Sequence, residues 1–265
     1  MHGCGNDFIL FNNFERKIDL NDPNVIKKMC QYHFGIGADG ILVLEPSNCA
    51  DFLLRYYNAD GFPSEMCGNG ARCAVSLAAK FNLAPDPCSF EIEKKLYKAN
   101  LLSHNKVQLF MNEPQIILDE GRIQSVPSKE FDKPLLVNTG VRHLVLQVNQ
   151  PLSNFDVEKW GKRFRYHPEF EPPGTNVNFI SVLDTQLLQS RIYERGVERE
   201  TLASGTGAVA CGFYAYHTFG WQSPISVQFP GGELIVNFNQ DFGNVSHIGP
   251  CDVVFEGKLD LSYFF

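Results

Sequence analysis

The stretch from Glu65 to Cys73 places a thiol, Cys67, in a glycine-rich turn just before a helical pattern. The glycines let backbone N–H groups converge on one point, and Ala71 to Lys80 has a helix-forming composition. A helix N-terminus lowers the pKa of a thiol below its reference of about 8.5 and binds carboxylates or phosphates. The stretch therefore predicts a reactive thiol beside an anion site. The competing interpretation is a small buried packing residue, as most free cysteines are.

The turn at Ala203 to Ala208 repeats this pattern in the second half of the chain. Ser204 follows Cys67 by 137 residues, and the same offset relates the two glycines after Ser204 to the two after Cys67. Several anchors in the same order indicate an internal duplication. We therefore expect two matching helix N-termini.

Paired proton-transfer groups on opposite faces of one carbon are what stereoinversion requires, because one removes the proton and the other returns it. Two helix N-termini aimed at one carboxylate would also stabilise the charge that develops as the α-proton leaves. The sequence has no P-loop GxxxxGK[ST] motif and no pyridoxal-phosphate lysine context. We therefore expect stereoinversion of a small molecule without a cofactor.

The elements that must position the two turns follow one order in both halves. The first half is predicted to contain strands at 8–11, 41–45 and 51–57, helices at 23–33 and 71–80, and a strand meander at 89–111. The second half has apolar strand segments at 135–140, 141–146, 177–183 and 189–193, then a helix from Gly205 towards Tyr216 and several short strands.

This order predicts an α/β (α+β) fold of two pseudo-symmetric lobes, each a β-sheet wrapped around a central helix, with the active site in the cleft between them. We expect residues 1–114 to form the first lobe and 115–251 the second. A C-terminal strand at about 252–265 would complete the first lobe.

Composition narrows the function further. A net charge of −7 argues against a nucleic-acid surface, and no window reaches the 18 apolar residues that span a bilayer. The eight cysteines form no zinc-type CxxC pairs, so we expect free thiols, no metal and a cytoplasmic protein. A glycine-rich turn almost at Met1 suggests that a few preceding strand residues are missing.

Seven segments resemble the diaminopimelate epimerase family, and the match runs nearly end to end. They are Gly5-Asn6-Asp7-Phe8, Gly35-Ile36-Gly37-Ala38-Asp39-Gly40, Asn58-Ala59-Asp60-Gly61, Met66-Cys67-Gly68-Asn69-Gly70-Ala71-Arg72-Cys73, Gly174-Thr175-Asn176-Val177, Glu194-Arg195-Gly196 and Gly205-Thr206-Gly207-Ala208. The resemblance implies an isomerase that interconverts LL- and meso-diaminopimelate without a cofactor, on the route to lysine and peptidoglycan.

The resemblance also implies roles for individual residues. Cys67 falls on one cysteine of the acid and base pair, and Ser204 on the position of the other. The substrate-binding positions are Asn6, Asn58 and Asn176, the backbone amides of Gly68, Asn69, Gly205 and Thr206, and Glu194 and Arg195 for the distal ammonium and carboxylate. His143 and Asp7 lie beside the two turns, as catalytic assistants or as structural partners.

The missing second cysteine is the main departure from the family. A serine hydroxyl is far harder to deprotonate than a thiol, so Ser204 could not readily share a two-base relay. Three explanations stand: a deliberate change that silences the enzyme or prevents a disulfide, a natural one-thiol variant, or slow epimerisation with another donor. The corresponding alternatives in function are a dehydratase or a racemase of another amino acid, and an inactive diaminopimelate-binding protein.

Two smaller departures lie near the distal side of the expected substrate. Val141-Arg142-His143 stands where many members have Asn-Pro-His, which removes one candidate contact. The segment Glu194 to Thr201 has one residue more than the common ERGxGET spacing. Either change could loosen selectivity. A homodimer is also expected, without a sequence feature that identifies its surface.

Overall fold

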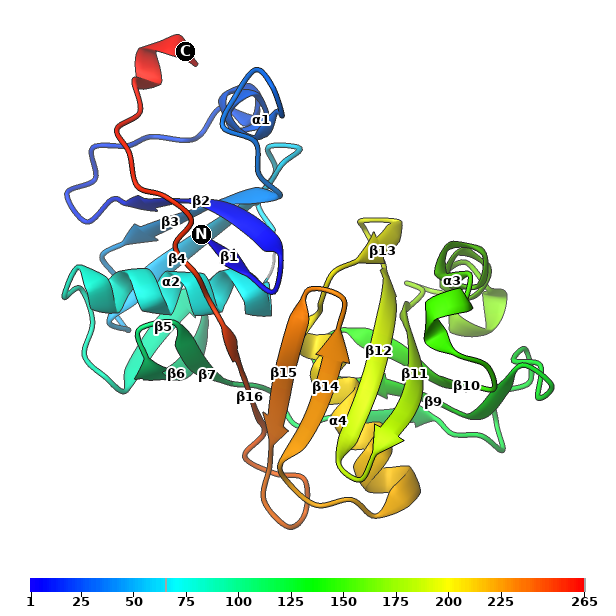
Figure 1. Ribbon diagram of the computed structural model, residues 1–265. Helices are drawn as coiled ribbons and strands as arrows, with labels where there is room; N and C mark the ends of the chain where they lie inside the picture. Colours follow the sequence, from blue (N-terminus) through cyan, green and yellow to red (C-terminus); the bar gives the residue numbers. More distant parts are fainter. Residues whose placement is uncertain (65, 265) are drawn as a thin grey trace. The chain divides into compact units, whose positions relative to one another are not determined.

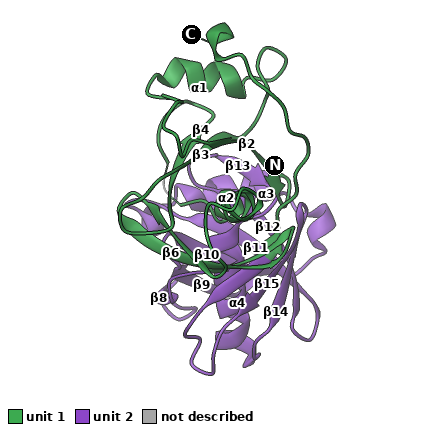
Figure 2. Ribbon diagram, turned by 90° about the vertical axis from the view of Figure 1, so that its left-hand side faces the viewer, with its two compact units in different colours: residues 1–109, 249–265 green, residues 110–248 purple. Residues whose placement is uncertain are grey.

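The computed structural model describes residues 1–64 and 66–264, so Glu65 and Phe265 lie outside the described residues. The chain divides into two compact units (Figure 2). Unit 1 comprises residues 1–109 and 249–265, and unit 2 comprises residues 110–248. The predicted domain bounds, 1–114 and 115–251, stay a prediction.

Unit 1 contains a mixed β-sheet whose strands lie in the order β1 to β7 (Figure 1). The strands are β1 His2–Gly3, β2 Asn6–Asn12, β3 Gly40–Glu45, β4 Phe52–Asn58, β5 Cys88–Ile92, β6 Lys95–Ser103 and β7 Lys106–Phe110. The pairs β2–β3 and β4–β5 are parallel, and the others are antiparallel.

The helix α2 (Gly68–Lys80) packs on this sheet and is buried from Gly68 to Ala78. Small residues such as Ala71, Ala74 and Ala78 bring its backbone close to the strands. The other helix of unit 1, α1 (Pro23–Cys30), begins at an Asp22 cap. The predicted extension of this helix to His33 is wrong, because Gln31 is extended and His33 adopts a φ of 71°.

Unit 2 repeats this arrangement with strands in the order β8, β9, β10, β11, β12, β14, β15 and β16. Their bounds are β8 Gln115–Leu118, β9 Phe131–Asn138, β10 Arg142–Val148, β11 Asn176–Asp184, β12 Leu187–Glu194, β14 Ile225–Phe229, β15 Gly232–Asn237 and β16 Ser246–Pro250, with β13 Arg199–Thr201 paired to β12. The helix α4 (Gly205–Phe219) packs on this sheet.

The internal duplication is visible in the pairing pattern. Successive neighbours from β2 to β7 are parallel, antiparallel, parallel, antiparallel and antiparallel. The strands β10, β11, β12, β14, β15 and β16 follow the same series. In each unit a central helix follows the third of these strands, so the predicted α+β fold of two repeated sheet-and-helix units is confirmed.

The helix α3 (Val157–Arg165) covers the outer side of β11 and β12 in unit 2. Val157 and Phe164 enter an aromatic cluster that includes Phe131 and Phe179. Asp156 caps the helix by accepting a hydrogen bond from Lys159 N–H at 3.0 Å. Because its buried face is fixed in this cluster, α3 holds its C-terminal residue, Arg165, at a defined place.

The end of the chain differs from the predicted strand at about 252–265. Within residues 251–264 only Asp252 forms a β-bridge, to His2, and Leu261–Tyr263 forms a short 3-10 helix. Val254 and Phe255 are exposed, so this segment lacks the burial that a strand in the sheet would have.

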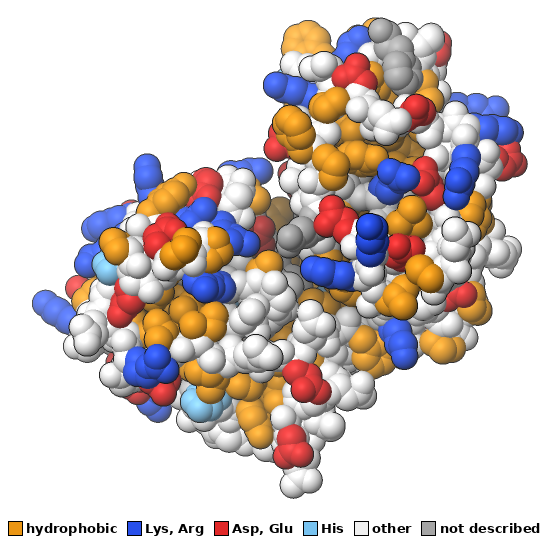
Figure 3. All heavy atoms as spheres, turned by 180° about the vertical axis from the view of Figure 1, so that it is seen from behind, with side chains coloured by type: hydrophobic (Ala, Val, Ile, Leu, Met, Phe, Trp, Pro, Cys, Tyr) orange, Lys and Arg blue, Asp and Glu red, His pale blue; other side chains and the backbone are white. Residues whose placement is uncertain are grey.

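Exposed hydrophobic side chains interrupt the charged surface on the face drawn in Figure 3. Exposed hydrophobic residues of unit 1 include Tyr32, Phe34 and Phe62, each at least 60% exposed. Over the part of the chain that the structure describes, no helix combines the length and apolar character needed to cross a bilayer.

Candidate active site

The first turn sets Cys67 at the N-terminus of α2. Cys67 is the cap residue, with extended backbone angles (φ −110°, ψ 118°), and its carbonyl accepts a hydrogen bond from Ala71 N–H at 2.8 Å. The thiol is half-buried and donates to Oδ1 of Asn6 at 3.5 Å. Cys67 is therefore a partly accessible thiol beside first-turn amides that the carbonyls of the helix do not satisfy.

A chain of side-chain hydrogen bonds fixes the orientation of Asn6. Arg72, which is fully buried, donates to Oδ1 of Asn69 at 2.8 Å, and Nδ2 of Asn69 donates to Oδ1 of Asn6 at 3.4 Å. Nδ2 of Asn6 then donates to Asp39 at 2.7 Å. A guanidinium only donates and a carboxylate only accepts, so the two ends leave one orientation for each amide. The oxygen of Asn6 consequently faces the sulfur of Cys67.

Asp7 and Asn58 shape the backbone beside this chain. Asp39 N–H donates to Oδ1 of Asp7 at 3.0 Å, while Asp7 N–H lies 3.4 Å from Oδ2 of Asp39. Burial, supported by the charge of Asp39, raises the pKa of Asp7. Asn58 ends β4 opposite Gly40, in the turn that Gly61 N–H closes on the Asn58 carbonyl. Asp7 thus acts as a partner of the Asp39 loop.

The second turn has the same backbone and different side-chain contacts. Ser204 caps α4 with φ −135° and ψ 126°, and its carbonyl accepts from Ala208 N–H at 2.9 Å. Its hydroxyl oxygen accepts from Gly207 N–H at 3.2 Å and lies 3.3 Å from Oγ1 of Thr206. Gly205 and Thr206 begin the helix, so their amides belong to the first turn.

His143 supports Thr206 from β10. Nδ2 of Asn178 lies 2.9 Å from Nδ1 of His143 and 3.4 Å from the carbonyl oxygen of Leu144. The Leu144 carbonyl can only accept, so the atom of Asn178 near it must be the donor Nδ2. The same Nδ2 also faces His143, so Nδ1 of His143 must accept a hydrogen bond from it. Nε2 therefore carries the proton and donates to Oγ1 of Thr206 at 3.0 Å.

His143 remains neutral in this setting. Burial, with the positive charge of Arg195, lowers the pKa of His143 to about 3. A neutral His143 donates to Thr206, whose own hydroxyl hydrogen is then free to point at Ser204. Gly207 N–H donates to the side chain at position 204, and the Thr206 hydroxyl is able to donate to it as well.

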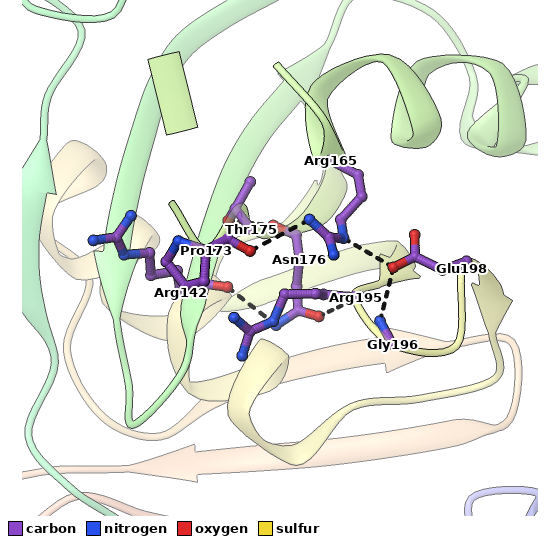
Figure 4. Close-up of polar contacts among 8 residues, drawn as sticks. All are labelled: Arg142, Arg165, Pro173, Thr175, Asn176, Arg195, Gly196 and Glu198. Carbon is purple, nitrogen blue, oxygen red and sulfur yellow. Dashed lines mark hydrogen bonds and ion pairs between the residues drawn. The ribbon is translucent and has the colours of Figure 1, made fainter. Parts of the chain in front are cut away.

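Asn176, the first residue of β11, and Arg195, in the turn after β12, form a third group (Figure 4). Oδ1 of Asn176 accepts from Arg195 N–H at 2.8 Å, and Nδ2 of Asn176 donates to the Arg142 carbonyl at 3.0 Å. Asn176 also pairs with His143 in the register of β10 and β11. Glu194 ends β12, immediately before Arg195.

The structure thus gathers the predicted residues into two clusters, one in each unit. Unit 1 holds Cys67, Gly68, Asn69, Asn6, Asp7 and Asn58, and unit 2 holds Ser204, Gly205, Thr206, His143, Asn176, Glu194 and Arg195. Sequence reasoning missed Asp39, Arg72 and Asn178. The first two stand inside quoted motifs, and Asn178 was detectable as a polar residue in an apolar strand segment.

Solved structures share this fold at low sequence identity. A PhzF-family phenazine biosynthesis protein from Bacillus anthracis superposes with a TM-score of 0.68 at 13% identity, covering 94% of this chain and 91% of that one. A hydroxyproline epimerase from Agrobacterium vitis gives a TM-score of 0.67 at 14% identity, covering 94% and 86%. At these identities the likeness shows that the chain shares the fold of these proteins.

Sequence comparison identifies the family and, with it, an isomerase of the epimerase type. The profile of the diaminopimelate epimerase family matches residues 1–117 and 135–254. Proteins named diaminopimelate epimerase are 35% identical in Aquifex aeolicus (98% of this chain, 96% of that protein) and 38% identical in Chlorobaculum tepidum (98% and 100%). One from Flavobacterium psychrophilum is 38% identical, with 97% of each chain covered. The chain belongs to the diaminopimelate epimerase family.

Proposed function

We propose that both helix N-termini act on one bound diaminopimelate and interconvert its LL and meso forms without a cofactor. The observation that supports this most directly is the matched pair of caps at Cys67 and Ser204, with the same backbone conformation and the same carbonyl bond. Free amides at both caps can bind the α-carboxylate and stabilise charge as the α-proton leaves.

The other residues that the family resemblance implies divide between the two ends of the substrate. The first-turn amides of Gly68, Asn69, Gly205 and Thr206 would bind the carboxylate at the reacting carbon. Glu194 and Arg195 would bind the distal ammonium and carboxylate, since a planar guanidinium suits a carboxylate. Asn6, Asn58 and Asn176 would complete the amide contacts with the substrate.

The hydrogen bonds around the two caps favour different protonation states. An amide oxygen faces the sulfur of Cys67, and an acceptor favours the protonated thiol. Donors from Gly207 and Thr206 face position 204, and donors favour an anion there. We infer that Cys67 rests as the acid and that position 204 is prepared for the base.

Ser204 limits what this chain can do on the second face. A hydroxyl is much less acidic than a thiol, and two hydrogen bonds do not make it a ready base at neutral pH. We propose that the chain binds diaminopimelate and moves a proton at Cys67, while full epimerisation is strongly impaired until a thiol stands at position 204.

Deuterium uptake at the α-carbon of diaminopimelate in heavy water tests this function. We expect the Ser204→Cys variant to exchange the α-proton and interconvert both isomers, and the unaltered chain to do so far more slowly. No uptake by the Ser204→Cys variant would contradict the epimerase proposal. Ligand-induced stabilisation without turnover in either form would favour an inactive binding protein, and elimination products would favour a one-thiol dehydratase.

The cytoplasmic location and the homodimer stay proposals. Exposed Tyr32, Phe34 and Phe62 of unit 1 are the side chains at which a second copy would gain apolar burial. Sedimentation of the unaltered chain and of a Phe34→Ser variant would test the dimer. An unchanged monomer in both would contradict it.

A further inference from the structure

Arg165, the last residue of α3, contacts both the turn that follows Arg195 and the loop that leads to Asn176. Its Nε donates to Oε1 of Glu198 at 3.0 Å, and its Nη1 donates to the Pro173 carbonyl at 3.4 Å (Figure 4). Pro173 lies in the loop that leads to Asn176, and Glu198 lies in the turn that follows Arg195. One guanidinium therefore joins the two loops.

Glu198 closes the turn that carries Arg195. Its Oε1 also accepts from Gly196 N–H at 3.0 Å, and its own N–H donates to the Glu194 carbonyl at 2.8 Å. Burial raises the pKa of Glu198, but the Gly196 amide, the Tyr166 hydroxyl and Arg165 together outweigh burial and lower it. The carboxylate of Glu198 thus holds the backbone after Arg195, and the backbone N–H of Glu198 holds the carbonyl before it.

The backbone conformation indicates that these contacts carry a cost. Glu198 adopts a φ of 58°, in the left-handed region that costs a side-chain-bearing residue about 1 kcal/mol. Across the contact, Gly174 has a φ of 80°, and a Cβ there would lie 2.1 Å from Nη1 of Arg165. This is also the segment with one residue more than the ERGxGET spacing. The extra length is therefore anchored rather than loose.

Arg195 depends on this turn for its direction. Its backbone N–H is held by Asn176, whereas its guanidinium makes no hydrogen bond or ion pair with any residue in 1–64 or 66–264. In Figure 4 this side chain extends away from Arg165 and Glu198. Where its charge lies is therefore set by the backbone of the turn.

We propose that Arg165 is a positioning residue that, through Glu198, fixes the turn carrying Arg195 and so sets the preference for substrates with a distal carboxylate. This inference rests on the proposed role of Arg195 in binding that carboxylate. A lysine at position 165 would keep the charge, but a single ammonium cannot reproduce the fork that reaches Glu198 and Pro173 together.

Hydrogen exchange tests the clamp without any ligand. We expect Arg165→Lys and Glu198→Gly to raise exchange of the amides in residues 194–198 by at least about fivefold, because their protection reflects local opening of the turn. The matched control is Lys162→Ala, an exposed residue of the same helix, which should leave this exchange unchanged. Unchanged exchange in both clamp variants would overturn the proposal.

Ligand preference tests the positioning role. Calorimetry would compare 2-aminopimelate with 2-aminoheptanoate, which differ only in the distal carboxylate. We expect both clamp variants to reduce the affinity ratio about tenfold and Lys162→Ala to retain it. Glu198→Gly also relieves the left-handed strain, so its melting temperature should be kept, and equal weakening of both ligands would overturn the positioning role.

Arg195→Ala separates the two levels of the proposal. If this variant leaves the ratio unchanged, the proposed role of Arg195 fails, and the exchange measurement still tests the clamp. If it abolishes the preference while Arg165→Lys and Glu198→Gly retain it, the clamp alone is overturned.

Discussion

The N-termini of α2 and α4 have the same backbone and opposite polarity around the cap side chain. Both cap residues have extended backbone angles. Each cap carbonyl accepts a hydrogen bond from the N–H group four residues later in the chain. The Cys67 thiol faces the amide oxygen of Asn6, whereas the hydroxyl of Ser204 faces the Gly207 amide and the Thr206 hydroxyl. Duplication therefore preserved the frame, while the polar surroundings of the two caps diverged.

This difference gives the two cap positions different preferences for the protonated form. Identical surroundings would give two groups with the same proton affinity, and neither would be preset as acid or base. Neutral His143 supports the donor side, and the Arg72–Asn69–Asn6–Asp39 chain supports the acceptor side. Each of the following experiments disturbs one side and uses the other as its reference.

The largest effect is expected from removing the thiol of Cys67. In a Ser204→Cys background, Cys67→Ser should lower α-proton exchange by about 10³-fold, because a hydroxyl neither donates nor regains the proton as a thiol does. Deuterium uptake measures the change. Cys49→Ser is the control, since Cys49 is exposed and distant in sequence from both turns, and it should retain activity. Comparable losses in both variants would contradict the role of Cys67.

Loss of Arg72 should be the largest stability effect. Arg72→Met removes the buried guanidinium that donates to the Asn69 oxygen and to the carbonyls of Gly68 and Pro250, which should cost about 3 kcal/mol. Urea unfolding measures this change. Arg55→Met is a matched control, because Arg55 forms a half-exposed ion pair with Glu45 that is worth about 0–1 kcal/mol. An equal loss in free energy of unfolding for Arg72→Met and Arg55→Met would mean that the buried hydrogen bonds of Arg72 do not stabilise the turn before α2.

Much of the fold could be predicted because its signals are local. Short apolar segments predicted β3, β4, β11 and β12, and the shared offset of the glycine turns predicted the duplication. The helix α3 was missed because only Val157, Gly161 and Phe164 are buried in a highly charged segment. Its signals were the Asp156 cap and the spacing of its apolar residues.

The candidate site was only partly predictable, for a physical reason. The sequence motifs predicted Cys67, Ser204, Asn6 and His143 as site residues. They did not predict which group donates and which accepts in the hydrogen bonds around these residues. The direction of these hydrogen bonds depends on Asp39 and Asn178, which come from separate strands and loops and meet only through tertiary packing. The clamp at Arg165 was missed for the same reason, since 33 residues separate it from Glu198.

The neutral state of His143 should appear in the dependence of stability on pH. Burial lowers the pKa of His143 to about 3, so below the unfolded value of about 6.5 the unfolded chain binds a proton that the folded chain does not. The free energy of unfolding therefore keeps the full contribution of neutral His143 above about pH 6.5. This contribution falls by about 2 kcal/mol by pH 5.

Chemical unfolding between pH 7 and pH 5 measures this decline. We expect His143→Gln to lack this part of it, because glutamine does not titrate. The control His217→Gln changes an exposed histidine and should retain the full decline. Parallel curves for the unaltered chain and His143→Gln would show that His143 is not held neutral.

The smallest effect, and the sharpest test of polarity, is the order in which two thiols react. In the Ser204→Cys variant, donors from Gly207 and Thr206 should favour the thiolate at position 204, while the Asn6 oxygen favours the protonated form of Cys67. We expect the pH midpoint for alkylation of the new thiol to lie about one unit below the midpoint for Cys67. This corresponds to a difference of about 1.4 kcal/mol in the free energy of thiol ionisation. Peptide mass spectrometry after brief iodoacetamide treatment resolves the two sites. Adding Thr206→Val removes one donor and should bring the two pH midpoints closer by moving only the midpoint of position 204. If Cys67 is instead alkylated at the lower pH, the surroundings of the two caps do not assign the acid and the base.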